Sequence, residues 1–171
     1  MNLRPYDSAD AAAIVSWVQN ERELRQWSAD RFADSPYPLT AERLDAFYAS
    51  KNPLLHPMTA TENGVPMGHV LLRWPEEGVP VVRLGFVIVN RNRRGTGLGQ
   101  ELVSAACCYA AGMMGAERVT LGVFLNNPAA GRCYRAAGFR TVKTKICRIG
   151  AENWRCAEMV LEPESSTLQD A

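Results

Sequence analysis

The sequence has few of the residues from which metal sites and disulfide frameworks are built. Histidine occurs only at His56 and His69, and neither has a second ligand at a helical or hairpin spacing, so we expect no metal ion. The five cysteines are odd in number and form no Cys-x-x-Cys pair, which argues against a disulfide framework. We therefore expect a reduced, cytoplasmic protein.

Long apolar runs and an excess of charge of one sign are also missing. No run approaches the roughly 18 residues that a membrane span requires, and residues 1–6 contain no apolar signal core. The 19 basic and 18 acidic residues give a formal net charge of +1. This balance argues against a protein that coats nucleic acid or an anionic membrane, so we expect neither as a partner.

The composition is that of one ordinary globular domain. Of the 171 residues, 47% are hydrophobic and 22% are charged, and a chain of this length buries a core without disulfides or metal. Residues 162–171 have no periodic apolar pattern and are expected to form a flexible tail. The sequence therefore predicts a single domain over residues 1–161.

Two short helices and an irregular connector are expected in the first third of the chain. Ser8 caps a helix that ends near Asn20, and Thr40 caps another that continues to about Ala49. Residues 21–39 mix charge, aromatic residues and prolines, which indicates an ordered but irregular connection between them.

The rest of the chain alternates strands with two further helices. The strand over 81–89 is apolar on both faces near its end, so we expect it at the centre of the sheet, with Gly85 marking a bulge or a close backbone approach. A helix over 97–113 has an apolar stripe that ends at Met113. The other expected elements are strands at 2–4, 58–61, 66–73, 118–125, 140–147 and 154–161, and a helix over 128–137.

A glycine-rich turn follows the central strand. Residues 94–100 read RGTGLGQ and open the long helix, where backbone N–H groups have no intrahelical acceptor and the helix dipole adds positive charge. Glycine allows an anion to approach the backbone closely. We expect the turn to bind a phosphate or pyrophosphate; the alternative is a simple glycine-rich connection.

The spacing of the glycines distinguishes between the possible classes of phosphate-containing ligand. A nucleotide-triphosphate loop needs Gly-Lys-Ser/Thr, whereas Gly99 is followed by Gln100 and Glu101. A dinucleotide fingerprint needs Gly-x-Gly-x-x-Gly, and the third glycine here comes one position early. A nucleotide-dependent oxidoreductase is therefore a weak alternative.

Two motifs resemble those of the GNAT superfamily of acyl-CoA-dependent N-acyltransferases. Residues 94–99 (RGTGLG) match the Arg/Gln-x-x-Gly-x-Gly/Ala signature, and residues 127–139 match an Asn-x-x-Ala-x-x-x-Tyr-x-x-x-Gly-Phe pattern at every specified position. The resemblance implies a single-domain, mixed α/β GNAT-like fold, with a mostly antiparallel twisted sheet of about seven strands and about four flanking helices. The N-terminal half is also similar to the branch that includes ribosomal-protein N-terminal acetyltransferases.

The resemblance implies acetyl-CoA as cosubstrate and assigns roles to individual residues. The pyrophosphate would lie on the backbone of residues 94–100, and the pantetheine arm would contact the central strand and the turn before the next helix. Tyr134 would protonate the leaving sulfur; its alternative role is a packed aromatic on an amphipathic helix. The cofactor-binding residues implied are Val87, Val89, Arg94, Gly95, Thr96, Gly97, Leu98, Gly99, Gln100 and Asn127.

The general base is where the chain departs from the family. Many relatives have a glutamate on the central strand, but the comparable position holds Arg83. A water relay, Glu76, Glu77 or His69 could replace it, although each side chain also has an ordinary structural or solvated role. Arg83 could instead indicate an acceptor that carries an acidic group.

The sequence therefore predicts an N-acetyltransferase that moves acetyl from acetyl-CoA to a primary amine in a ternary complex. A covalent route through cysteine is the second mechanism, and Cys107, Cys108 and Cys133 lie in predicted helices with no histidine partner. A non-catalytic acyl-CoA-binding or regulatory module is the second function. A homodimer formed through exposed strand edges is plausible.

Overall fold

The computed structural model describes residues 1–35, 37–50 and 52–162. The predicted tail lies outside these ranges except for Glu162, whose carboxylate is 3.4 Å from Arg118 and 3.1 Å from Arg140. The described strands are β1 (Asn2–Pro5), β2 (Leu55–Glu62), β3 (Val65–Arg73), β4 (Val81–Val89), β5 (Arg118–Phe124), β6 (Arg140–Ile149) and β7 (Glu152–Leu161). The helices are α1 (Ala11–Ser16), α2 (Glu21–Ser28), α3 (Ala41–Tyr48), α4 (Leu98–Met114) and α5 (Pro128–Ala136), with 3₁₀ turns η1 (Ser8–Asp10) and η2 (Arg91–Arg93).

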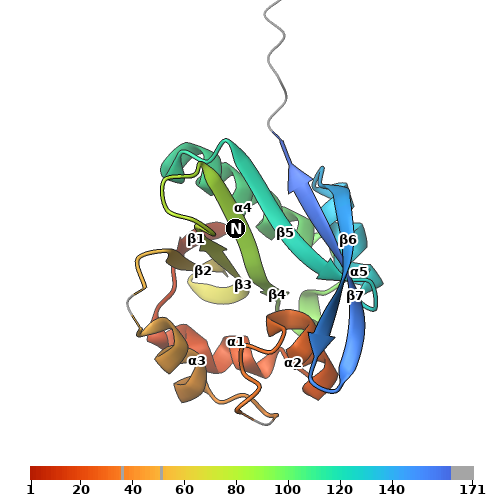
Figure 1. Ribbon diagram of the computed structural model, residues 1–171. Helices are drawn as coiled ribbons and strands as arrows, with labels where there is room; N and C mark the ends of the chain where they lie inside the picture. Colours follow the sequence, from red (N-terminus) through yellow and green to blue (C-terminus); the bar gives the residue numbers. More distant parts are fainter. Residues whose placement is uncertain (36, 51, 163–171) are drawn as a thin grey trace, which may run out of the picture.

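The strands form one twisted sheet in the order β1-β2-β3-β4-β5-β7-β6 (Figure 1). Among the described strands β4 and β5 are the one parallel pair, and every other pairing is antiparallel. The mixed, mostly antiparallel sheet is confirmed, with five α-helices where about four were expected.

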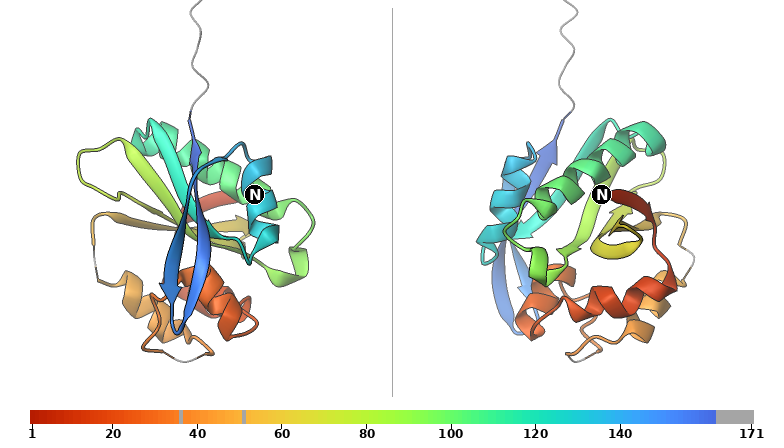
Figure 2. Two further views of the ribbon diagram at one scale, coloured as in Figure 1. Left: turned by 45° about the vertical axis from the view of Figure 1, so that its right-hand side comes forward. Right: turned by 180° about the vertical axis from the view of Figure 1, so that it is seen from behind.

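Helices cover both faces of this sheet, as the views in Figure 2 show. Beneath α4 and α5, Leu102 packs in one apolar cluster with Leu84 of β4. Beneath α1 to α3, Leu44 belongs to a second cluster that contains Phe86 of the same strand. Side chains two positions apart normally share a face of a sheet, so β4 must change its register between Leu84 and Phe86.

A bulge in β4 produces this change. Leu71 of β3 pairs with Gly85, and His69 pairs with Ile88, so one β3 residue lies opposite two residues of β4. Phe86 has a φ of 50°, which is rare for a residue with a side chain. The sequence predicted a bulge or a close backbone approach at Gly85; Gly85 itself is paired, and the bulge lies directly after it, at Phe86 and Val87. Because of this bulge, the side chains in the second half of β4 point to the opposite faces of the sheet from those that a regular strand would give.

The N-terminal helix differs from the prediction at both ends. Asp7, not Ser8, caps the turn: its side chain accepts a hydrogen bond from the Ala9 N–H at 2.9 Å, and the Asp10 carboxylate accepts one from the Asp7 N–H at 3.0 Å. This reciprocal capping box satisfies two backbone donors, which a cap at Ser8 would not do. The helix α1 ends at Ser16 rather than near Asn20.

The prediction of an irregular connector over 21–39 was wrong for its first eight residues, which form α2. The Asn20 side chain accepts a hydrogen bond from the Glu23 N–H at 2.8 Å and caps this helix. Leu24 and Trp27, three positions apart, are both buried. The cap and the spacing were visible in the sequence, but the charged residues around them concealed the short helix.

The apolar stripe of α4 also ends differently from the prediction. Met113 is 75% exposed, whereas Ala110 is fully buried and Met114 packs against the core. The residue four positions after Ala110 continues the same helical face, so Met114 takes the place expected for Met113.

Burial of His69 predicts a loss of stability in mild acid. The side chain is fully buried, its Nε2 lies 2.7 Å from the Tyr48 hydroxyl, and burial lowers its pKa from 6.5 to about 3. Below pH 6.5 the unfolded chain takes up a proton here that the folded chain does not, so stability falls by up to about 1.4 kcal/mol per pH unit.

Urea denaturation between pH 6.5 and 5 measures this slope. We expect His69→Gln to flatten the dependence of the unfolding free energy on pH. Equal slopes in the variant and the native protein would show that His69 is not the group responsible.

Candidate active site

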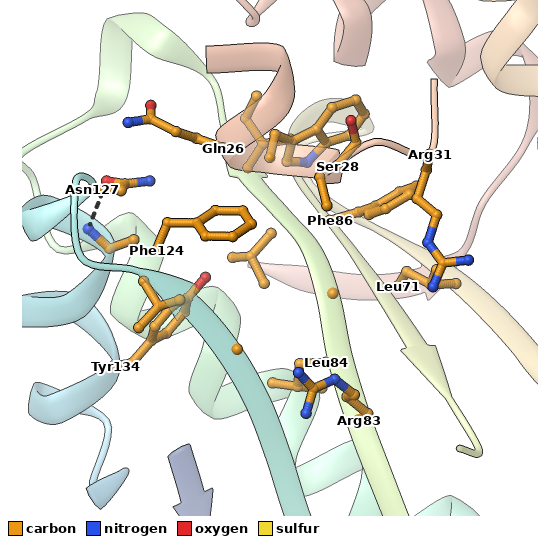
Figure 3. A pocket seen from close by; sticks show the side chains of 18 of the residues that line it. Gln26, Ser28, Arg31, Leu71, Arg83, Leu84, Phe86, Phe124, Asn127 and Tyr134 are labelled. Carbon is orange, nitrogen blue, oxygen red and sulfur yellow. Dashed lines mark hydrogen bonds between the residues drawn. The ribbon is translucent and has the colours of Figure 1, made fainter. Parts of the chain in front are cut away.

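A cavity of about 1510 Å³ crosses the sheet between β4 and β5. One end is lined by the glycine-rich turn and α5, and the other by α2, α3 and the end of β3. Figure 3 shows Gln26 of α2 above the cavity, Asn127 and Tyr134 on one side and Arg31 on the other. The cavity therefore extends from the predicted anion site to the helices and strand on the other side of the opening.

The sheet itself opens at this point. The parallel pairing of β4 with β5 begins at Val81 and ends where Leu84 lies opposite Leu121. Beyond it β4 continues along β3, while β5 continues along β7 from Gly122 to Phe124. The inner edge of β4 from Gly85 onward therefore has no neighbouring strand, and a ligand with its own amide groups can hydrogen-bond there.

The glycine-rich turn has the backbone geometry of an anion site. The first hydrogen bond of α4 runs from the Glu101 N–H to the Gly97 carbonyl at 3.1 Å, so the amides of residues 98–100 have no partner within the helix. Gly95 and Gly97 have φ angles of 76° and 89°, and a Cβ at either would point into open space. The turn thus offers free donors and room for a phosphate group.

Most of the residues predicted to bind the cofactor line this cavity. They are Val87, Val89, Arg94, Gly95, Gly97, Gly99, Gln100 and Asn127. Thr96 and Leu98 do not: the Thr96 hydroxyl donates to the Arg93 carbonyl at 2.6 Å, and the Leu98 side chain is buried.

Arg94 makes contacts that its sequence position did not predict. Its guanidinium forms an ion pair with Glu23 at 2.5 Å and donates to the Trp17 carbonyl at 2.8 Å. These bonds tie the glycine-rich turn to α2 and to the end of α1. The arginine therefore helps to position the turn against the helices that cover the cavity.

Tyr134 projects from α5 toward the middle of the cavity. Asn127 caps this helix by accepting a hydrogen bond from the Ala130 N–H at 3.2 Å, and Pro128 occupies the first turn. Tyr134 is only 8% exposed, yet its hydroxyl faces the cavity near Phe124 (Figure 3). Burial raises the pKa of this phenol well above 10, so it carries its proton at neutral pH.

The carboxylates that line the cavity are both paired. Glu23 is held by Arg94, and Glu158 of β7 accepts two hydrogen bonds from Arg83 at 2.7 and 3.2 Å and an ion pair from Lys145 at 2.6 Å. Burial raises the pKa of Glu158, but the hydrogen bonds from Arg83 and Lys145 outweigh it and leave the pKa lowered. Both carboxylates are therefore already engaged by basic side chains, and the lowered pKa of Glu158 also disfavours its protonation.

None of the side chains considered as a base in place of the strand glutamate lines the cavity. His69 is enclosed beneath α3 against Tyr48, and burial keeps it neutral with little tendency to accept a proton. Glu76 and Glu77 lie in the β3–β4 connection, outside the residues that line the cavity. The structure therefore supports the ordinary roles of these three side chains.

Sequence reasoning missed the helix that covers the cavity. Gln26 of α2 donates to the Asn126 carbonyl at 3.0 Å, a contact that crosses from one side of the opening in the sheet to the other. Trp27 of the same helix lines the cavity. The cap at Asn20 was the signal that could have identified this helix.

Two of the three thiols that line the cavity, those of Cys133 and Cys156, are poorly suited to covalent catalysis. Burial raises the pKa of Cys133, and that of Cys156 to about 11, so both are protonated at neutral pH. We expect Cys133→Ala to keep turnover within about twofold of the native rate, measured by release of free CoA thiol. Loss of turnover in a folded variant that still binds CoA would support the covalent route.

Residues 1–35, 37–50 and 52–162 contain no group of three side chains that could hold a metal ion. No helix in the same ranges is long and apolar enough to cross a membrane.

Solved structures with a similar fold include two acetyltransferases. A spermidine N-acetyltransferase from Vibrio cholerae, in complex with CoA and spermine, superposes with a TM-score of 0.77 at 17% identity, over 94% of each chain. A ribosomal-protein-S5-alanine acetyltransferase from Vibrio fischeri gives a TM-score of 0.73 at 16% identity, over 95% of this chain and 93% of that one. At these identities the likeness shows a shared fold.

The family is established by a separate match. The model of the acetyltransferase (GNAT) family matches residues 19–139, which include β4, the glycine-rich turn and α5. The chain therefore belongs to the GNAT acetyltransferase family, and it is an acyl-CoA-dependent acetyltransferase with acetyl-CoA as its cosubstrate.

Proposed function

We propose that this enzyme transfers the acetyl group of acetyl-CoA directly to a primary amine while both substrates are bound. The observation that carries the proposal is the position of Tyr134, a protonated phenol that faces the same cavity as the anion-binding turn and the open edge of β4. One cavity thus offers a phosphate site, a backbone edge and a proton donor.

The backbone of residues 94–100 would hold the pyrophosphate of acetyl-CoA. Val87 and Val89 would offer peptide groups to the pantetheine arm along the open edge of β4, and Asn127 would contact its other side. The Arg132 side chain, exposed on α5 and lining the same end of the cavity, adds positive charge near the phosphates. This arrangement would place the thioester at the opening between β4 and β5.

In the reaction a neutral amine attacks the thioester carbonyl, a C–N bond forms, and the C–S bond breaks to release CoA. The backbone N–H near Val87 would stabilise the negative charge that develops on the carbonyl oxygen. The Tyr134 hydroxyl would give its proton to the departing sulfur. Because both cavity carboxylates are paired, the amine proton would leave through water rather than to a side chain.

Release of CoA thiol across a panel of amines tests this function. The panel should contain a polyamine, a peptide with a free N-terminus and small amines with and without an acidic group. We expect thiol release above the rate of hydrolysis with at least one amine. Tight binding of acetyl-CoA with no release across the panel would instead favour the non-catalytic acyl-CoA-binding module.

A further inference from the structure

A row of charged side chains crosses the sheet at the end of the cavity away from the glycine-rich turn. Arg73 of β3 and Arg83 of β4 are directly paired in register, which places their Cβ atoms about 5 Å apart on one face. Arg83 reaches over Gly122 of β5 to Glu158, and Glu158 in turn meets Lys145 of β6. All five residues line the cavity.

The charges in this row do not balance. Glu158 is the single carboxylate among them, and it is already bonded by both Arg83 and Lys145. Arg73 is half-buried and makes no side-chain hydrogen bond or ion pair with any residue in the described parts of the chain. Arg31 also lines this end of the cavity, on the side away from Asn127 in Figure 3. This end of the cavity, away from the glycine-rich turn, therefore has an excess of positive charge.

Arg73 is the arginine that this excess of positive charge affects most. Its pKa is lowered, first by burial and then by the neighbouring charges of Arg83 and Arg31. A half-buried cation without a counter-ion is unfavourable, and an oxyanion bound beside it would relieve both effects. Arg73, half-buried in the cavity wall opposite Arg83 and without a counter-ion among the described residues, therefore forms a site that favours an anion.

We infer that the amine acceptor carries an oxyanion, a carboxylate or a phosphate, and that Arg73 binds it together with Arg31. This inference rests on the proposed function, because it assigns the acceptor of the same reaction. A planar guanidinium binds either oxyanion through paired hydrogen bonds. The anion would hold the acceptor at the wall formed by β3 and β4, with its amine directed toward the opening beside Gly85.

The same charges would assist the chemistry. Positive side chains near a bound ammonium group disfavour its charged form and so lower its pKa, which increases the fraction of neutral amine. This effect reduces the need for a general base, and the two carboxylates that line the cavity are already paired. It also disfavours an acceptor that carries several positive charges, such as the polyamine named for the Vibrio cholerae neighbour.

Matched acceptors test the inference. β-Alanine is compared with β-alaninamide, and phosphoethanolamine with ethanolamine, by the kcat/KM for CoA release; spermidine is the polycationic member. We expect at least one anionic acceptor to exceed its neutral partner by about tenfold or more, which is the range for a hydrogen bond to a charged group. The pair that shows the preference identifies the anion as carboxylate or phosphate.

Removal of the arginine charge should abolish this preference. In Arg73→Gln the ratio of anionic to neutral acceptor should approach one, while Arg155→Gln, an exposed site on β7 outside the cavity, should keep the native ratio. Turnover that is equal for charged and neutral partners, or fastest with spermidine, would overturn the inference and leave the acetyltransferase function standing.

A binding measurement that needs no turnover distinguishes the anion site at Arg73 from the proposed transfer of acetyl to an amine. Calorimetry would measure the affinity of glutarate and of methylphosphonate for the protein saturated with CoA. We expect one of them to bind the native protein about tenfold more tightly than Arg73→Gln. Equal affinities would overturn the anion site even if no amine released CoA, whereas Arg73-dependent binding with no CoA release from any amine would contradict only the proposed function.

Discussion

Gly97→Glu is expected to abolish acetyl-CoA binding. The Cβ at this position points into open space above the turn, where the phosphate would lie, so the new carboxylate would occupy the site and repel the anion. At a hundred times its dissociation constant, acetyl-CoA should stabilise the native protein by about 2.7 kcal/mol, or about 5 to 10 °C in the melting temperature. We expect a shift below about 1 °C in the variant, measured by thermal unfolding with and without acetyl-CoA.

Gly64→Glu is the matched control for this change. Gly64 has a φ of 79°, a Cβ there also points into open space, and the residue lies in the β2–β3 turn outside the cavity. Both substitutions therefore incur the same kind of backbone strain, on the order of 1–2 kcal/mol. The control should keep the full shift with acetyl-CoA. A native-sized shift in Gly97→Glu would mean that the turn does not bind the cosubstrate.

Tyr134→Phe is expected to slow turnover by about 10² to 10³-fold while acetyl-CoA still binds. The substitution removes the hydroxyl that faces the cavity and keeps the ring, which packs edge-to-face with Phe139 at a centroid distance of 6.3 Å. A positioned general acid contributes about 10² to 10⁴-fold to a rate, so its loss should appear in kcat. Steady-state release of CoA thiol measures kcat, and the thermal shift measures binding.

Tyr109→Phe provides the comparison for the loss of a phenol. Tyr109 lies on α4, packs against the same core and does not line the cavity. We expect its kcat to stay within about twofold of the native value. If both variants retained full activity, Tyr134 would be a packing residue and another group would protonate the sulfur.

The sequence was most informative where local chemistry determines the structure. Asn127 and Pro128 specify the start of α5, and the glycines of residues 94–100 specify the turn before α4, because caps and left-handed glycines act within a few residues. The bulge in β4 was also predictable to within two residues, since it directly follows Gly85. These local features account for most of the residues that line the cavity beside the glycine-rich turn, where the pyrophosphate of acetyl-CoA would lie.

The other end of the cavity, around Arg73 and Arg83, depends on contacts between distant segments of the chain. Sequence reasoning predicted this end poorly. Arg83 was noticed because it replaces an expected glutamate, but its partner Glu158 lies 75 residues away and was not foreseen. Arg73, which the structure places opposite Arg83, had no local pattern to mark it. The pairing register of β3 with β4 and of β5 with β7 brings these charges together, and register is a property of the whole sheet.

The central claim is direct transfer of acetyl to an amine, and a single-turnover experiment with isotopically labelled acetyl-CoA tests it most directly. The native enzyme, in excess over the cosubstrate, is mixed with the amine that gives the fastest CoA release, quenched at intervals and analysed by mass spectrometry. We predict that the label passes from acetyl-CoA to the amine with no labelled protein at any time. Transient acetylation of the protein at a cysteine, or label that remains on CoA throughout, would contradict the account.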